Sequence, residues 1–418
     1  MDFELLIVGS DINAYHMARS YYEEYKRKAY LIGNMPVAVT YYSKILNFEL
    51  IEDFKSASIF IKTLKKFYEE HSDKKILLIG SDDTYVRLII ENQEELKKYF
   101  IFHQYSLDTL NMLLSKDKFY QEFKGLDVTD TYIYDINTDL NMFKINELGY
   151  PLTIKLGSEK RYHELNTLCE VKVFVARDIY ELLDTISKIR NTGYDKSLII
   201  QRQLDNDESS LFDCVSYVDR FGKVVLMSFA EIGLQEYDIN ATGNITVLVN
   251  GFNEFGGTKK VVEDLRKTLE STDFRGIIRF KFIYNKSNKK YEVIEVNPRQ
   301  ARSSYYLTFA GYNLVKYLVE DLIRNKRLEY KFIDDEVCLS FVSKKIINKY
   351  IKNSKMRVKI DELYDKGKFV NPIKYSKDKS IKRAFWLKTN DSNYNKKYKE
   401  RCTIWKEEKN IIRIIPLL

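Results

Sequence analysis

Two short apolar runs in the N-terminal part of the chain are each followed by the same three residues, Gly-Ser-Asp. Leu5–Val8 precedes Gly9-Ser10-Asp11, and Ile76–Ile79 precedes Gly80-Ser81-Asp82. A continuous apolar run that stops at such a turn is typical of a buried parallel strand. Between the two runs lie apolar residues at helical spacing: Phe60, Leu64 and Phe67. Strands that alternate with helices predict a parallel α/β domain over residues 1–108. The turn after the first run lacks the G-x-G-x-x-G pattern, so no dinucleotide fingerprint is present.

The middle of the chain has a different pattern. Two pairs of apolar segments flank short polar turns, Val215–Val218 with Val224–Ala230 and Gly276–Ile283 with Tyr291–Val296. Such pairs predict β-hairpins, and therefore antiparallel sheet combined with helices. Residues 109–150 are expected to be mainly helical and connecting. Further strands are expected at these segments: Pro151–Lys155 and Ser197–Gln201.

A chain of 418 residues is too long for a single hydrophobic core and predicts roughly two to four domains. We expect an α/β domain over 1–108, a linker and first lobe over 109–200, and a second lobe over 201–330. A small basic α+β region is expected over 331–418, with a final strand at Ile411–Leu418. The predicted fold class is thus α/β together with α+β.

The net charge of +8 is unevenly distributed. Residues 331–418 contain 23 basic and 11 acidic residues, a net charge of +12, which leaves about −4 for the first 330 residues. A basic region of this kind attracts nucleic acid, an anionic membrane surface or an anionic substrate. No nucleic-acid module accompanies it, so we do not expect nucleic acid as a partner. A solvated basic surface and a site for an anionic substrate both remain open.

The cysteines and the apolar runs indicate the cellular compartment in which the protein is expected. Cys169, Cys214, Cys338 and Cys402 lie far apart and form no C-x-x-C pair, which is typical of free thiols in a reducing compartment. The N-terminal residues lack the features of a signal peptide. No apolar run approaches the ~18 residues that span a bilayer. We therefore expect a cytoplasmic protein without a transmembrane segment.

The segment around residue 295 contains the strongest functional signal. Tyr291–Val296 alternates as a β-strand does, so Glu295 and Asn297 are expected on one face. A carboxylate and an amide oxygen on one face suit Mg²⁺, whose remaining ligands are water and phosphate. Arg299 and Arg302 follow directly in the sequence. A guanidinium group can bind two oxygens of one phosphate or carboxylate at the same time. The alternative is an edge strand with a solvated charged end.

This run resembles the metal-binding strand of ATP-grasp enzymes. Its extension through Arg299–Tyr306 and Gly311-Tyr312-Asn313 is similar to the D-aspartate ligases and their carboxylate–amine ligase relatives, although Ala301 stands where that branch usually has glycine. Gly9–Tyr15 also resembles the start of the family's N-terminal domain. The resemblance covers about residues 1–330. It implies a pre-ATP-grasp α/β domain, a two-lobed ATP-grasp domain and a small basic C-terminal appendage.

The resemblance also implies roles for individual residues. Lys118 and Lys155 would neutralise phosphates, and the strand Ile199–Leu204 would contact adenine through Gln201 and Leu204, with Asp207 at the ribose. Glu295 and Asn297 would bind the metal ion, and Arg299 and Arg302 would act in catalysis. The implied substrate residues are these: Asp11, Asn13, Arg19, Gly243, Asn244 and Ser303. For Asp11, Asn13 and Arg19 the alternative is turn and helix-cap chemistry, and for Gly243 and Asn244 it is a tight turn.

One departure from the family bears on activity. The strand before the metal-binding strand usually carries a further acidic ligand, but here its two positions on one face are Arg279 and Lys281. A cation cannot ligate Mg²⁺ and repels it. Either the basic pair neutralises the triphosphate and fewer metal ions bind than is usual, or the chain binds a nucleotide or peptide without catalysis.

By resemblance, the expected function is ATP-dependent ligation of a carboxylate to an amine through an acyl phosphate. ATP and Mg²⁺ are the expected cofactors. The expected carboxylate is D-aspartate or a similar amino acid, and the expected acceptor is an anionic cell-wall peptide precursor, with peripheral contact if that precursor is membrane-linked. The alternatives are a ligase for another amino acid or peptide, or an impaired binding protein. The oligomeric state is left open.

Overall fold

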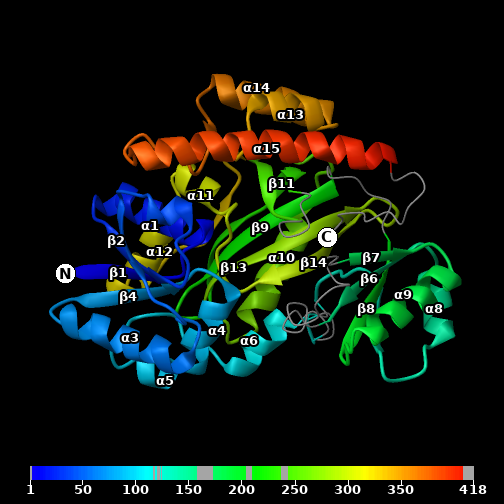
Figure 1. The fold of residues 1–418 in the computed structure, drawn as a ribbon, viewed down its shortest axis with the longest axis horizontal. Coiled ribbons are helices and arrows are strands. Elements are labelled where there is room, and N and C mark those ends of the chain that lie inside the picture. The colour runs from blue at the N-terminus through cyan, green and yellow to red at the C-terminus, as the bar shows by residue number, and fades with distance from the viewer. Residues whose placement is uncertain are drawn as a thin grey trace.

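The computed structural model describes residues 2–115, 118–119, 123, 125–157, 173–203, 210–236 and 243–407. In this part of the chain the strands form three sheets, one N-terminal, one central and one small (Figure 1). The strands are β1 (Phe3–Val8), β2 (Ala29–Gly33), β3 (Leu46–Leu50), β4 (Lys75–Gly80), β5 (Thr131–Asp135), β6 (Leu152–Leu156), β7 (Val173–Ala176), β8 (Ser197–Arg202), β9 (Leu211–Val218), β10 (Val224–Ser228), β11 (Ala230–Gln235), β12 (Ile245–Asn250), β13 (Gly276–Asn285), β14 (Lys290–Asn297), β15 (Lys331–Ile333), β16 (Val337–Ser340) and β17 (Phe369–Val370).

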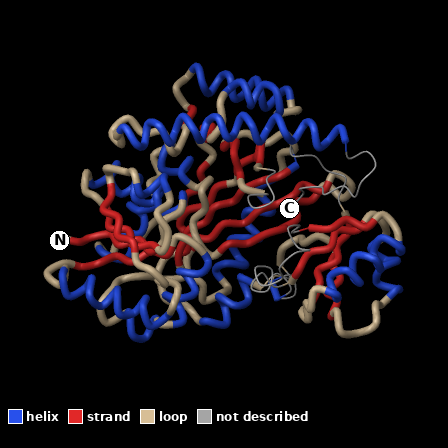
Figure 2. Tube along the Cα trace, in the orientation of Figure 1, coloured by secondary structure: helices blue, strands red, loops and turns tan. Residues whose placement is uncertain are grey.

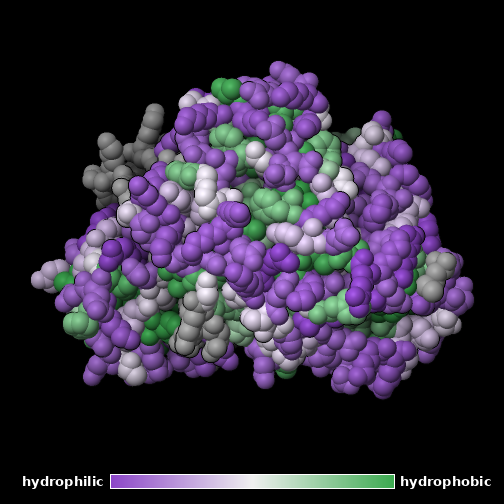
Figure 3. Space-filling view, turned by 180° about the vertical axis from the view of Figure 1, so that it is seen from behind, coloured by the Kyte–Doolittle hydropathy of each residue, from purple (hydrophilic) through white to green (hydrophobic). Residues whose placement is uncertain are grey.

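Helices cover the sheets, and Figure 2 shows the strands as a band through the middle of the molecule with helices outside it. The helices are α1 (Ile12–Tyr25), α2 (Ala38–Tyr41), α3 (Ala57–Glu70), α4 (Asp83–Glu91), α5 (Gln93–Leu96), α6 (Leu107–Leu114), α8 (Met142–Leu148), α9 (Ile179–Asn191), α10 (Thr258–Glu270), α11 (Tyr305–Phe309), α12 (Leu314–Leu318), the π-helix η2 (Val319–Ile323), α13 (Lys344–Tyr350), α14 (Ser354–Asp365) and α15 (Ile381–Glu407). Figure 3 shows that hydrophilic residues cover most of the opposite face of the molecule.

The N-terminal sheet is parallel, with strand order β3-β2-β1-β4, which confirms the predicted α/β arrangement. All six residues of β1 are buried, as expected for a strand with helices on both faces. In α3 the buried side chains are those whose spacing predicted the helix: Phe60, Leu64 and Phe67. Asp11 and Asp82, which end the two Gly-Ser-Asp turns, cap α1 and α4 by accepting hydrogen bonds from Ala14 N and Tyr85 N, each 3.0 Å long.

The central sheet contains nine strands, in the order β14-β13-β9-β11-β12-β16-β17, with β10 and β15 beside this path. Both predicted hairpins are present as β9–β10 and β13–β14. The segment expected as one strand over Val224–Ala230 is divided, because β10 and β11 pair with different parts of β9. Phe229 stands at the division and packs its ring against Phe212 and Phe282.

The small sheet is antiparallel, with strand order β5-β8-β6-β7, and α8 and α9 pack on it. It includes the segments predicted as strands near residues 152 and 198. It also includes β5, which lies in the stretch expected to be mainly helical. Figure 1 shows this lobe at the opposite end of the molecule from the N-terminal sheet. An isolated bridge between Val128 and Val293 connects its base to β14.

The C-terminal region, residues 331–418, contributes strands to the central sheet. Its strands pair with strands of the middle third, β15 with β10 and β16 with β12. The long helix α15 runs horizontally in Figure 1 between this sheet and the helices α13 and α14. The expected strand at Ile411–Leu418 lies outside the described residues. Among the described residues, no helix has the length and apolar composition needed to cross a bilayer.

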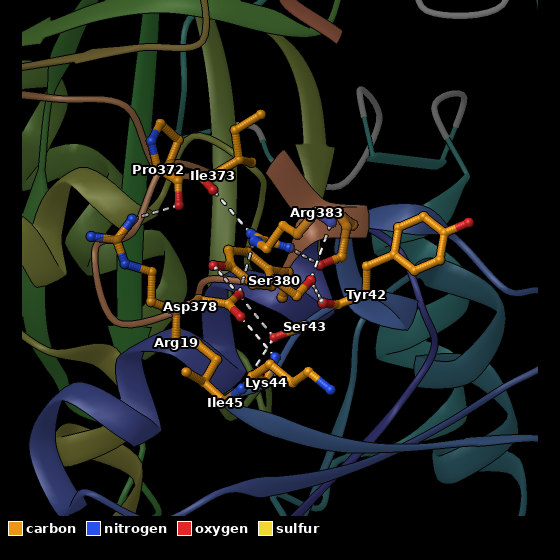
Figure 4. Close-up of polar contacts among 12 residues, drawn as sticks. Arg19, Tyr42, Ser43, Lys44, Ile45, Pro372, Ile373, Asp378, Ser380 and Arg383 are labelled. Carbon is orange, nitrogen blue, oxygen red and sulfur yellow. Dashed lines mark hydrogen bonds and ion pairs between the residues drawn. The ribbon is translucent and has the colours of Figure 1, made fainter. Parts of the chain in front are cut away.

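A buried ion pair attaches the start of α15 to the N-terminal domain (Figure 4). Arg383 is completely buried, pairs with Asp378 at 3.1 Å, and donates to Val39 O at 2.7 Å. Asp378 accepts hydrogen bonds from Ser43 Oγ at 2.9 Å and Lys44 N at 2.7 Å. Both charged side chains are removed from water, so loss of one charge leaves the other buried and uncompensated.

Arg383→Met is therefore expected to reduce the free energy of unfolding by about 3–5 kcal/mol. The matched control is Lys382→Met at the neighbouring exposed position, which should change it by less than about 0.5 kcal/mol. Urea denaturation followed by tryptophan fluorescence measures both variants. Equal stability of the two variants would contradict a stabilising role for the buried pair.

Candidate active site

The predicted metal-binding residues lie on one face of β14, beside the basic residues of β13. The register pairs Glu295 with Lys281 and Asn297 with Arg279. Asn297 Nδ2 donates to Glu295 Oε1 at 3.0 Å, and Arg279 Nη1 lies 3.7 Å from the same Glu295 oxygen. The structure thus brings together the four side chains that the alternation of the two strands places on one face.

A further acid, Asp213 of β9, lies against this group. It is fully buried, forms an ion pair with Arg279 and accepts a hydrogen bond from Ser303 Oγ at 3.0 Å. Burial alone would lower the pKa of Arg279, but Asp213 and Glu295 outweigh it and raise that pKa. Sequence reasoning missed Asp213. Its signal was one carboxylate within the otherwise apolar segment Leu211–Val215.

Lys281 is fully buried and lies beside the turn that was predicted to contact substrate. Its Nζ donates to Gln235 Oε1 and to the carbonyl oxygen of Gly243 at 3.3 Å. Gly243 and Asn244 directly precede β12 and lie beside the end of β11, since Gly243 N donates to Glu236 O and Glu236 N donates to Asn244 O. Gly243 has a φ of +87°, a conformation that glycine adopts without strain. Turn geometry therefore accounts for the glycine, and Lys281 contacts its carbonyl group.

Arg299 connects the end of β14 to the N-terminal domain. It binds both carboxylate oxygens of Asp83, at 2.8 and 3.1 Å, and donates to Asn297 Oδ1 at 3.2 Å. Such a bidentate pair is strong and fixes the plane of the guanidinium group. The turn after β4 is therefore held against the end of β14.

The N-terminal substrate candidates make protein contacts of their own. Asn13 Nδ2 donates to Ser81 O at 3.0 Å and so joins the two Gly-Ser-Asp turns. Arg19 lies between the rings of Tyr305 and Tyr375, at 4.4 Å from each ring centroid, and donates to Pro372 O at 2.6 Å. These contacts hold α1 against later parts of the chain.

The side chain of Arg302 lies beside the end of β11, where it contacts residues of the C-terminal helix α15. It pairs with Glu236 at 2.6 Å, donates to Tyr394 Oη at 2.8 Å and packs 4.3 Å above the Phe341 ring. Lys397 of α15 also reaches Glu236, at 3.3 Å. Sequence reasoning missed Glu236, which follows β11 and meets Arg302 within the central sheet. It also missed Tyr394 and Lys397, because they reach this group only when α15 packs over the sheet.

The small sheet carries the other predicted nucleotide residues. Lys155 of β6 and Gln201 of β8 are buried, and Lys155 Nζ donates to Gln201 Oε1 at 2.7 Å. Gln201 Nε2 donates in turn to Thr131 Oγ1 at 2.8 Å. Lys118 is exposed. The other two predicted nucleotide residues, Leu204 and Asp207, lie outside the described residues.

Glu295 and Asn297 offer oxygens suited to one Mg²⁺. Mg²⁺ is commonly bound by one or two protein oxygens together with substrate phosphates. Both side chains also contact arginines, Arg279 and Arg299. No group of three or more His, Cys, Asp or Glu side chains with metal-site geometry occurs among the residues that the structure describes. This donor set fits a metal ion that depends on nucleotide phosphates for its remaining ligands.

Asp11 titrates in an unusual range. Burial is the main cause that raises its pKa from 3.8 to about 6, and the neighbouring Asp82 adds to the increase. An acid whose pKa is higher in the folded protein than in the unfolded chain destabilises the fold as pH rises. For Asp11 this destabilisation is small below about pH 4 and complete above about pH 6.

Asp11→Asn removes the charge and keeps a good helix cap. We expect it to increase the free energy of unfolding, and to do so by about 1 kcal/mol more at pH 8 than at pH 5. Urea denaturation at the two pH values measures the difference. An equal increase in the free energy of unfolding at both pH values would show that the charged Asp11 carboxylate does not destabilise the fold.

Comparison with known proteins shows what the chain is similar to. No protein-family model matches the chain. A D-aspartate ligase of Enterococcus faecium (strain Aus0004) is 28% identical over an alignment of 417 positions that covers 96% of each protein. The similarity therefore extends into the C-terminal region.

Solved structures share the fold. N5-carboxyaminoimidazole ribonucleotide synthetase of Thermus thermophilus has a TM-score of 0.59 at 13% identity, over 80% of this chain and 82% of that one. L-amino acid ligase of Bacillus licheniformis has a TM-score of 0.55 at 15% identity, over 79% and 75%. The biotin carboxylase domain of Hydrogenobacter thermophilus 2-oxoglutarate carboxylase, solved with MgADP, has a TM-score of 0.60 at 12% identity, over 80% and 73%. Nearly the whole chain is thus similar to a D-aspartate ligase, and its fold is shared with these carboxylase, synthetase and ligase structures.

Proposed function

We propose that this ATP-grasp ligase joins the carboxylate of D-aspartate, or a similar amino acid, to an amine of a cell-wall peptide precursor. The observation that carries the proposal is the group of Glu295, Asn297, Arg279 and Lys281 on one face of the β13–β14 hairpin. It combines metal-binding oxygens with fixed positive charge. The near full-length relationship to a D-aspartate ligase supports the choice of substrate. A reducing, cytoplasmic setting suits the buried free thiols of Cys214 and Cys338.

The reaction proceeds in two displacements. A carboxylate oxygen of the substrate attacks the γ-phosphorus of ATP, the bond from that phosphorus to the bridging oxygen breaks, and ADP leaves. The amine nitrogen of the acceptor then attacks the acyl carbon, the amine loses a proton and phosphate leaves, so that amide, ADP and phosphate are the products. Such chemistry requires positioning and neutralisation of charge more than covalent catalysis.

The chain's own residues supply that positioning. Lys155, oriented by Gln201, would bind nucleotide phosphates, and Arg279 and Lys281 would stabilise the transferring phosphoryl group. Glu295 and Asn297 would hold Mg²⁺, which when bound offsets negative charge on the phosphates. Arg302, held by Glu236 at 2.6 Å, would bind the substrate carboxylate together with Ser303.

One observation favours a second candidate function. Arg279 lies 3.7 Å from Glu295 and contacts the oxygen that would ligate the metal. A chain in which this ion pair persists would bind nucleotide or peptide without turnover. We prefer catalysis because Asp213 also pairs with Arg279, so its positive charge does not depend on Glu295 for compensation.

Glu295→Gln is expected to reduce ADP release below detection, since the amide keeps the shape but is a poorer Mg²⁺ ligand. The assay supplies ATP, Mg²⁺, a panel of D- and L-amino acids and a lysine-containing peptide acceptor. Glu263→Gln, on the exposed face of α10, is the control and should retain the activity of the original protein. Turnover by Glu295→Gln would show that the metal is bound elsewhere.

Arg279→Met tests the choice between the two functions. If Arg279 stabilises the phosphoryl group, this variant loses about 10–100-fold in kcat/KM for ATP, the value of one charge-assisted hydrogen bond. If Arg279 instead blocks the metal, turnover appears or increases in the variant. Arg27→Met at a partly exposed surface ion pair controls for loss of a guanidinium group and should leave kcat/KM unchanged.

A further inference from the structure

The first turns of α15 expose two large apolar side chains. Ile381 is 91% exposed, the highest value among the large hydrophobic residues that the structure describes, and Phe385 is 75% exposed. They are four residues apart in a helix, so they lie on the same side of it. Neighbouring large apolar side chains with this exposure are unusual on a protein surface and indicate a contact with another surface.

Lysines surround these two side chains. Residues 374–390 contain six basic residues and one acidic residue. The acid, Asp378, is buried and paired with the buried Arg383, so it does not offset the surface charge. Lys374 pairs with Asp391 at 2.6 Å. The remaining lysines are exposed: Lys377, Lys379, Lys382 and Lys388. The surface is therefore apolar at its centre and positively charged around it.

The underlying backbone is held in place (Figure 4). Asp378 accepts hydrogen bonds from Tyr15, Ser43 and Lys44 of the N-terminal domain, and Arg383 donates to Val39 O and Ile373 O. These contacts fix the loop before α15 and its first turn. The side of the turn that carries Arg383 is thus occupied, which leaves Ile381 and Phe385 directed away from the anchor.

A hollow of about 710 Å³ adjoins the same turn, lined by Tyr375, Ile381 and Leu387 together with Lys374 and Lys379. Apolar walls with lysines among them suit a molecule that has both an apolar part and an anionic group. Lipids of an anionic membrane have this chemistry, because acyl chains lie next to phosphate head groups.

We propose that this face, Ile381 and Phe385 with Lys377, Lys379, Lys382 and Lys388, binds the surface of an anionic membrane. The two apolar side chains enter the boundary between head groups and acyl chains, and the lysines contact lipid phosphates. Charge complementarity favours lipid over a second copy of the chain, since two copies of this face would bring like charges together. The membrane contact does not depend on which carboxylate and amine the enzyme joins.

Flotation with lipid vesicles tests the proposal. We expect the full chain to float with vesicles of phosphatidylcholine and phosphatidylglycerol, and not with phosphatidylcholine alone. Removing one lysine should weaken partitioning by about fivefold, so Lys382→Gln/Lys388→Gln should weaken it by about 25-fold. Ile381→Ser/Phe385→Ser should weaken it by at least about tenfold.

Matched controls lie elsewhere on the surface. Phe143→Ser/Tyr180→Ser removes side chains that are 71% and 81% exposed on the small lobe, and Lys62→Gln/Lys259→Gln removes two other exposed lysines. Both controls should float like the original protein. All variants should keep the melting temperature and the rate of ADP release of the original protein in vesicle-free solution. Flotation does not require turnover, so failure of the ligase assay would leave the test of membrane binding unaffected.

A tryptophan on the proposed face offers an independent readout, since the chain contains two tryptophans that can be replaced. In a Trp386→Phe/Trp405→Phe/Phe385→Trp variant, tryptophan fluorescence should be quenched by vesicles with brominated acyl chains. Absence of quenching despite flotation would show that another face binds. Equal loss of flotation in the controls would overturn the proposal. The proposal would also be overturned if light scattering showed a dimer of the original protein and a monomer of the Ile381→Ser/Phe385→Ser variant. The face would then contact a second copy of the chain.

Discussion

The candidate site depends on how positive charge is accommodated inside the central sheet. Arg279 is buried between Asp213 of β9 and Glu295 of β14. An isolated guanidinium group at this position would cost several kcal/mol in lost hydration. Three neighbouring strands must therefore keep their register for the acids to reach the cation. The same register places Lys281 opposite both Asp213 and Glu295.

Contacts of charged side chains also connect parts of the chain that are far apart in sequence. Arg299 binds Asp83, and Arg302 binds Glu236. Asp378, which pairs with Arg383, accepts hydrogen bonds from Tyr15 and Ser43 of the N-terminal domain. Asp321 adds a fourth junction, since it accepts hydrogen bonds from Tyr217 Oη at 2.8 Å and Arg220 N at 3.0 Å. Burial opposes ionisation of Asp321, yet hydrogen bonds from His103 and Tyr217 hold its pKa below the usual value. Polar junctions of this kind lose stability when one partner is removed, so they favour one arrangement of the domains.

Much of the fold could be predicted because its elements have strong local patterns. The parallel strands β1 and β4 are continuous apolar runs, and α3 buries the three residues whose spacing predicted it. The predicted face of Glu295 and Asn297 follows from alternation along a strand. The strand β5 was missed because its five residues lie in a stretch that otherwise connects helices, and its partner β8 is more than sixty residues away.

The local chemistry follows from the order of the residues alone: two Gly-Ser-Asp turns, two hairpins, a carboxylate and an amide on one strand face, and a basic C-terminal region. These features depend on neighbouring residues and on the two-residue period of a strand. Which charges compensate one another depends instead on the tertiary structure. Asp213, Glu236 and Tyr394 are separated from their arginine partners by about 66 to 92 residues. Their contacts form when the central sheet assembles and α15 packs over it, and no local pattern specifies that approach.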